Sequence, residues 1–244
     1  MAILANQEKL YGIPDVFGKD REMQVQNAMD SLLENQIASM DMDGNIMMAE
    51  SYHALMDLVC SCEECITIHY QNQGQRQGYL LWKKVGRILL AEAIGGKFLF
   101  SWPDRTVVQS VFDALLVDRT YVERGRSVVI PRIVLQKVQR MCLEAQTEEA
   151  LRVLRQNGAP VAIAWAIAEE YLGKVCSYKL VYMQPGRRDA ETVQLACIAS
   201  AELCLRVSQT VQNLRTCMAF GETDPAGVNQ DVQNIARAFL EGWE

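Results

Sequence analysis

Four side chains with metal-binding chemistry lie within ten positions of one another. In the stretch LVCSCEECITIHY, Cys60, Cys62, Cys65 and His69 have the spacing C-x-C-x2-C-x3-H. Thiolate and imidazole groups are the ligands that zinc prefers, but structural zinc sites draw their ligand pairs from two separated segments. Here all four candidates are local. If CITIHY is a strand, Cys65 and His69 face the same side of it.

The alternative is that these cysteines are buried thiols. Free cysteine behaves as a small buried hydrophobe. The other five cysteines each occur within an apolar pattern: Cys142, Cys176, Cys197, Cys204 and Cys217. The sequence therefore favours core packing for the cluster and keeps a zinc site at Cys60, Cys62, Cys65 and His69 as the alternative. We expect no other metal and no cofactor.

No catalytic constellation stands out in the sequence. The chain has only two histidines. It contains no nucleophile elbow, phosphate-binding loop, dinucleotide-binding fingerprint or zinc-protease helix. The sequence indicates a protein that is not an enzyme, and an enzyme of an unrecognised type stays open without residues to assign to it.

Charge and hydropathy limit the partners. The 244 residues include 24 Lys and Arg against 30 Asp and Glu, a net charge of −6. An acidic chain without a run of basic residues repels phosphate backbones, so we expect no nucleic-acid partner. The start of the chain lacks a signal-peptide pattern. The most apolar stretches, 87–100 and 159–172, are too short or too interrupted to span a bilayer. We expect a cytoplasmic protein without membrane insertion.

One apolar stripe recurs three times along the chain. The segments VQNAMDSLL (25–33), VQSVFDALL (108–116) and VQNIARAFL (232–240) place apolar residues at i, i+3, i+4, i+7 and i+8. This spacing is typical of an amphipathic helix whose apolar face packs on a core. Each segment also begins Val-Gln, which a stripe alone does not require. Further helices are expected at 47–60, after the turn DMDGN, and at 128–142.

Between these helices the periodicity changes to that of strands. We expect strands at 65–70, 79–85, 87–94, 97–102, 175–184, 192–199, 202–209 and 213–220. The pair Gly95-Gly96 predicts a tight turn. Asp104 and Asp224, the latter followed by proline, are the expected N-caps of the helices after the two groups of strands.

This order predicts an α+β protein made of two pseudo-repeated halves, each with helices followed by an antiparallel sheet and a closing helix. The first half, 1–118, has its strands within 65–102 and its closing helix at 104–117. The second half, 119–244, has its strands within 175–220 and its closing helix at 225–241. We expect one compact unit in which the halves share a sheet or an interface.

With this layout the chain resembles the EspG family of chaperones from ESX (type VII) secretion systems, together with its Firmicute relatives. The resemblance lies in the helix, DMDGN turn and helix, followed by WKKVGRILLAEAI and KFLFSW. It continues through PDRTVVQSVFDALL to NLRTCMAFGETDPAGVNQDVQNIARAFLEG near the C-terminus. It is a resemblance of pattern and order over most of the chain.

The resemblance implies a bacterial, non-catalytic chaperone or adaptor that holds a secreted helical protein substrate and masks an apolar helical tip before export. Such proteins use the central sheet, the C-terminal helices and a loop between two strands of the first half. The corresponding loop is QNQGQRQG (71–78), where Gln73, Gln75 and Arg76 are the candidate protein-binding residues. The alternative is a flexible hairpin without a binding role. A homodimer stays open.

Overall fold

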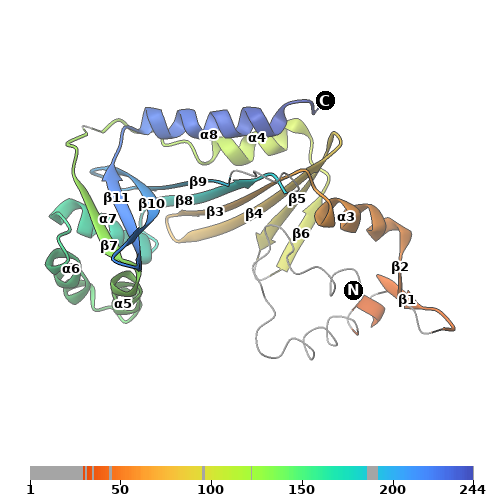
Figure 1. Cartoon of the computed structure of the whole chain (residues 1–244), viewed down its shortest axis with the longest axis horizontal. Helices are drawn as coiled ribbons and strands as arrows, with labels where there is room; N and C mark the ends of the chain where they lie inside the picture. Colours follow the sequence, from red (N-terminus) through yellow and green to blue (C-terminus); the bar gives the residue numbers. More distant parts are fainter. Residues whose placement is uncertain are drawn as a thin grey trace.

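The computed structural model describes residues 30, 32–34, 36–43, 46–94, 97–121, 123–185 and 192–243. The protein is α+β, as predicted: helices lie on both faces of a large antiparallel sheet (Figure 1). No helix in the described ranges combines the length and the apolar character needed to cross a membrane. The expected helix at 25–33 and the Gly95-Gly96 turn lie largely or wholly outside the described residues.

A nine-stranded sheet forms the centre of the molecule. Its strand order is β6-β5-β4-β3-β8-β9-β10-β11-β7, and every neighbouring pair is antiparallel. The strands are β3 (Glu64–Asn72), β4 (Gln75–Lys84), β5 (Arg87–Ile94), β6 (Lys97–Ser101), β7 (Ser127–Pro131), β8 (Cys176–Met183), β9 (Val193–Ala199), β10 (Cys204–Gln212) and β11 (Arg215–Glu222). The eight strands expected from periodicity are therefore confirmed.

The strands of the two predicted halves meet at the middle of this sheet. Strand β3 pairs with β8 over seven residue pairs, from Cys65 opposite Met183 to Gln71 opposite Ser177. Alternation along β3 sends Ile66 and Ile68 to one face, where both are fully buried. Cys65 and His69 point to the other face. The sheet thus has two sides, and each takes its own helices.

Helices α4 (Arg105–Asp113) and α8 (Pro225–Leu240) lie side by side on the first face (Figure 1). Each begins at the predicted N-cap: the carboxylate of Asp104 accepts a hydrogen bond from the Val107 N–H, and that of Asp224 accepts one from the Ala226 N–H. The predicted stripes face a common core, and the rings of Phe112 and Phe239 lie 6.4 Å apart.

The opposite face is covered at two places by different helices. Helix α3 (Glu50–Cys60) packs its Leu58 and Val59 over Trp82 of β4. Helices α5 (Arg132–Leu143), α6 (Thr147–Gln156) and α7 (Val161–Tyr171) form a bundle over the other end of the sheet (Figure 1). The part of the sheet between α3 and this bundle is where the candidate site lies.

Two predicted helices begin later than expected. The segment 128–142 starts with β7, which pairs with β11, and α5 begins only at Arg132. The segment 47–60 likewise starts in the short strand β2 (Ile46–Met48), which pairs with β1 (Ala38–Met40) ahead of α3. Short apolar runs such as VVI fit a strand or a helix equally well, and a strand partner distant in the sequence decides between them.

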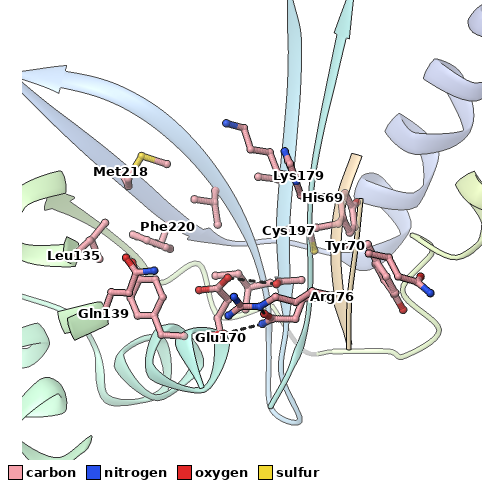
Figure 2. A pocket seen from close by; sticks show the side chains of 18 residues that line it. His69, Tyr70, Arg76, Leu135, Gln139, Glu170, Lys179, Cys197, Met218 and Phe220 are labelled. Atoms are coloured by element: carbon pink, nitrogen blue, oxygen red, sulfur yellow. Dashed lines mark hydrogen bonds between the residues drawn. The ribbon is translucent and has the colours of Figure 1, made fainter. Parts of the chain in front are cut away.

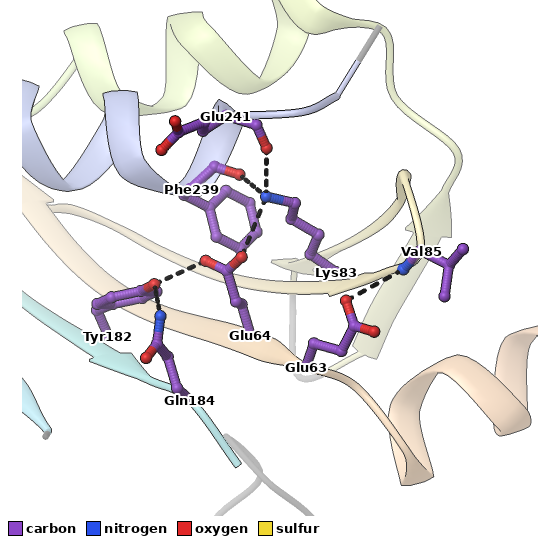
Figure 3. Close-up of polar contacts among 8 residues, drawn as sticks. All are labelled: Glu63, Glu64, Lys83, Val85, Tyr182, Gln184, Phe239 and Glu241. Carbon is purple, nitrogen blue, oxygen red and sulfur yellow. Dashed lines mark hydrogen bonds and ion pairs between the residues drawn. The ribbon is translucent and has the colours of Figure 1, made fainter. Parts of the chain in front are cut away.

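A buried lysine fastens the end of α8 to the sheet (Figure 3). The ammonium of Lys83, on β4, donates to the carbonyl oxygens of Phe239 (2.7 Å) and Glu241 (2.8 Å). It also pairs with the Glu64 carboxylate at 3.1 Å. Tyr182 donates to that same carboxylate from β8. The cation thus meets the carbonyl end of the helix, where the helix dipole is negative.

Candidate functional site

The predicted binding loop is a tight hairpin turn. Strand β3 continues to Asn72 and strand β4 begins at Gln75. The prediction of an eight-residue loop at 71–78 was therefore wrong. Only Gln73 and Gly74 form the turn, with φ angles of 47° and 82°. Positive φ at both central residues is the requirement of the type I′ turn that joins two twisted strands. The polar composition of the segment concealed the strands, because backbone pairing does not depend on apolar side chains.

The tip of this hairpin contacts the end of helix α7. The Gly74 N–H donates to the Gly173 carbonyl at 2.6 Å. The Gln71 amide donates to the Glu170 carbonyl at 2.8 Å, and Arg76 donates to the Gln71 side-chain oxygen at 2.7 Å. Gln71 is only 7% exposed as a result. The hairpin of the first half is therefore held against the helical bundle of the second.

A cavity of about 450 Å³ lies beside this contact (Figure 2). Its volume is within the range typical of ligand sites. The sheet supplies one side of the cavity with His69, Ser177, Lys179, Ala196, Ile198, Val207, Met218 and Phe220. The helices and the hairpin supply the other sides with Leu135, Gln139, Glu170, Tyr171, Gln71, Arg76 and Gln77. The site thus combines an apolar sheet surface with polar groups around it.

The charges of the site are arranged unevenly. Burial raises the pKa of Glu170, and the nearby Arg76 guanidinium opposes that rise. Burial and the neighbouring Lys179 lower the pKa of His69, so its imidazole is neutral at pH 7. Arg76 and Lys179 are exposed, which leaves two cations on the open side of the cavity. The buried carboxylate lies deeper, at the end of α7.

Burial holds two further groups beside the cavity in their neutral forms. Cys197 borders the cavity from β9, but its thiol packs in the core on the other face of the sheet, where its contact with Cys204 and burial raise its pKa. The pKa of the Tyr171 hydroxyl is raised by burial and by Glu170. A thiol and a phenol held in their neutral forms are poor nucleophiles and bases at neutral pH. The cavity otherwise offers an apolar surface with the His69 imidazole, the Glu170 carboxyl group and several hydrogen-bond donors around it.

The structure places one of the three predicted binding residues at the cavity. Arg76 lines it, whereas Gln73 and Gln75 are exposed at the hairpin tip and do not line it. Sequence reasoning missed Glu170 and Lys179. Glu170 carries a signal in retrospect, since it follows the apolar run AIAWAIA on one helix. Lys179 is placed by the β3–β8 pairing, opposite His69, and no local pattern indicates that pairing.

The four residues of the zinc alternative do not gather at one point. Cys62 and Cys65 are buried in the core under α3, where burial raises the pKa of their thiols to about 11 and about 12. His69 lies four residues along β3 from Cys65, about 13 Å at the rise of a strand. Throughout the described ranges, no group of three or more His, Cys, Asp or Glu side chains is arranged to hold a metal ion.

Comparison with known proteins finds similarity among solved structures. No family model and no curated protein matches the sequence. Among solved structures, the chain is similar to the Mycobacterium tuberculosis type VII secretion system chaperone EspG5, determined in complex with the PE25-PPE41 dimer. The identity is 13% and the TM-score 0.47, and the match covers 87% of this chain and 85% of that chain.

Proposed function

We propose that this protein is a non-catalytic chaperone or adaptor that holds the helical tip of a secreted protein in the cavity beside the β3–β4 hairpin. The observation that supports this most is the cavity itself, an apolar sheet surface bordered by the hairpin and by α5 and α7. Exposed side chains of His69, Arg76 and Lys179 at the cavity leave it open to a macromolecular partner.

The size of the cavity suits the end of a helix better than its length. One turn of α-helix, about 10–12 Å wide and 5.4 Å long, occupies roughly 400–600 Å³. The cavity holds about 450 Å³, close to one turn. A helical tip with apolar side chains would cover the half-buried Ala196, Val207 and Met218 while the rest of the helix stays outside.

The polar groups of the cavity suit the carbonyl end of a helix. The last four carbonyl groups of a helix have no partner within it and carry a partial negative charge. Arg76 and Lys179 supply cations, and Gln139 supplies an amide donor. We therefore expect the client to present the C-terminal end of a helix or a helix–helix turn.

The type VII-like secretion pathway is inferred from the sequence resemblance. The resemblance to the EspG family lies in the helix, DMDGN turn and helix, in the strands 82–94 and 97–102, and in the closing segments of both halves. It supports a bacterial, cytoplasmic chaperone of a type VII-like pathway whose clients are secreted helical proteins. We place the client in the cavity because of its apolar lining and its exposed cations.

The test is co-purification of the full chain from its native host. Ala196 lies on the sheet surface of the cavity and is half-buried, so Ala196→Trp would fill the space that a client needs. We expect this variant to bind a helical secreted partner with an affinity at least about tenfold lower, which corresponds to ~1.4 kcal/mol. Arg76→Ala should lower the affinity for the same partner.

Gln75→Ala is the matched control, because Gln75 is on the same hairpin but outside the cavity. It should leave the partner bound. Circular dichroism melting of each variant separates lost binding from lost folding. If all three variants retain the partner equally, or if only Gln75→Ala loses it, the client does not bind in the cavity and the proposal fails.

A further inference from the structure

The strand at the first-half end of the sheet carries exposed apolar side chains. Strand β6 is the terminal strand, and among the residues that the structure describes no strand pairs with its outer edge. Four of its residues or close neighbours are 42–60% exposed: Phe98, Leu99, Phe100 and Trp102. An apolar edge strand of this kind is a template for pairing with another chain.

The two ends of the sheet differ in how they are protected. At the other end the terminal strand is β7, which ends in Pro131, and proline at an edge blocks further pairing. Strand β6 begins with one charged residue, Lys97, and the remaining four positions, Phe98 to Ser101, carry neither proline nor charge. Natural proteins place such residues on edges that must stay unpaired.

The sequence of β6 is complementary to itself about Leu99. If two copies pair antiparallel around a two-fold axis at this residue, Leu99 meets Leu99 of the second copy. Phe98 then lies opposite Phe100 of the second copy, and the reverse pair forms on the other side of the axis. Aromatic side chains directly opposite each other in an antiparallel pair stabilise it.

Aromatic side chains on β4 and β6 form a row that ends at the outer edge of β6. The Trp82 ring on β4 is stacked with the Phe100 ring at 6.3 Å, and the Phe98 ring is 6.5 Å from that of Phe100. Phe98 and Phe100 share the sheet face of Trp82, since they pair with Ala93 and Ala91 of β5. Pairing of two copies would continue this row across the two-fold axis.

We propose that β6 is the interface of a homodimer, in which two copies join their sheets edge to edge through antiparallel β6 strands. A second copy fits better than an unrelated strand because the Phe-Leu-Phe register matches itself and a two-fold interface uses the same surface twice. This surface lies at the opposite end of the sheet from the α5–α7 bundle, so the inference does not depend on the proposed chaperone function.

The expected dimer is weak. The exposed parts of Phe98, Leu99, Phe100 and Trp102 amount to roughly 400 Å² for each copy, given about 150–250 Å² for a large apolar side chain. A standard stable interface buries about 800 Å² from each partner. We therefore expect a dissociation constant in the micromolar range, with a dimer of twice 27.5 kDa at high concentration.

Light scattering coupled to size exclusion, and sedimentation velocity, of the full chain at about 1–200 µM test the dimer. Leu99→Lys would place two cations opposite each other at the axis and should raise the dissociation constant at least about tenfold. The cation itself is tolerated in the monomer, because Leu99 is 60% exposed and pairs with Glu92 of β5. Leu99→Glu should weaken the dimer in the same way, and because the new carboxylate faces Glu92, circular dichroism melting checks that this variant stays folded.

Mixing the Leu99→Lys and Leu99→Glu variants gives the most specific test. One lysine then lies opposite one glutamate at the axis, so the mixture should form a heterodimer. Val211→Lys is the matched control, an equally exposed apolar strand residue on β10, and it should leave the dimer intact. Hydrogen exchange of residues 98–101 should quicken in Leu99→Lys. A monomer at 200 µM, a dimer unchanged by Leu99→Lys, or protection in a monomeric chain of the outward-facing β6 amides, which do not bond to β5, would overturn the proposal.

Discussion

Lys83 is a buried cation that connects strand β4 to the C-terminal end of α8. Its side chain is 9% exposed and its ammonium has three oxygen partners, two of them the last carbonyls of α8. The Phe239 ring lies 5.7 Å from the same ammonium. Its neighbour Lys84 pairs with the exposed carboxylate of Asp57 instead. Two adjacent lysines thus have opposite roles, because successive residues of a strand point to opposite faces.

Replacing Lys83 by methionine should destabilise the fold by about 3–5 kcal/mol, because Glu64 and two helix carbonyls would lose their buried partner. Lys84→Met is the control of the same size and charge change. We expect it to have little effect, since its ion pair is exposed to solvent. Urea unfolding followed by circular dichroism measures both. Equal losses in the two variants would mean that the Lys83 contacts contribute nothing specific.

At the scale of elements, the contact between the β3–β4 hairpin and the end of α7 determines the shape of the candidate site. Gly74 and Gly173 approach so closely that a Cβ on Gly173 would meet the Gly74 Cα at 3.4 Å. Gly173 also has a φ of +73°. Glycine is favoured here by backbone conformation, and a Cβ would fill the remaining space up to van der Waals contact with the hairpin tip. The hairpin reaches the helix because β3 pairs with β8, which follows α7 directly.

Gly173→Ala should therefore cost more than the strain of its backbone conformation. Gly158→Ala is the matched control: its φ is +87°, and nothing lies within 4 Å of the added Cβ. In both variants an alanine must adopt the left-handed backbone conformation, which destabilises the fold by about 1–2 kcal/mol for a residue with a Cβ. We expect Gly173→Ala to lose more stability and to quicken hydrogen exchange at the hairpin tip. If the two variants behave alike, the hairpin is not held by this contact.

At the scale of the molecule, one sheet runs through both predicted halves. The core under α4 and α8 takes side chains from β3, β4 and β5 of the first half and from β8 and β9 of the second. Removing either half would expose a central strand edge and the apolar faces of α4 or α8. We interpret the halves as related units that share one core, and their origin as a repeat stays a prediction.

The chain should accordingly unfold as one cooperative unit. Hydrogen exchange in low urea should give peptides from β4 and peptides from β10 the same free energy of opening, because the β3–β8 pairing couples the halves. Circular dichroism and tryptophan fluorescence should show coincident transitions. Two separate transitions, with one set of strands opening first, would contradict a shared core.

Much of the fold is encoded locally and was predictable from the sequence. The closing helices follow from their i, i+3, i+4 stripes and from the Asp104 and Asp224 caps, which act within a single turn. The apolar strands follow from alternation or from continuous apolar runs. The buried positions of Cys62 and Cys65 agree with the interpretation of core thiols.

The site itself depended on tertiary structure. Whether residues 71–78 form a loop or two paired strands depends on backbone hydrogen bonds between strands, which polar side chains do not reveal. Arg76, Glu170 and Lys179 come together only because β3 pairs with β8, more than 100 residues away in the chain. The sequence by itself determined the two closing helices and most strands, since their signals lie within a few neighbouring residues, whereas it gave no expectation of α6 and α7. The order of the strands in the sheet, and with it the cavity and the exposed β6 edge, was decided by long-range packing.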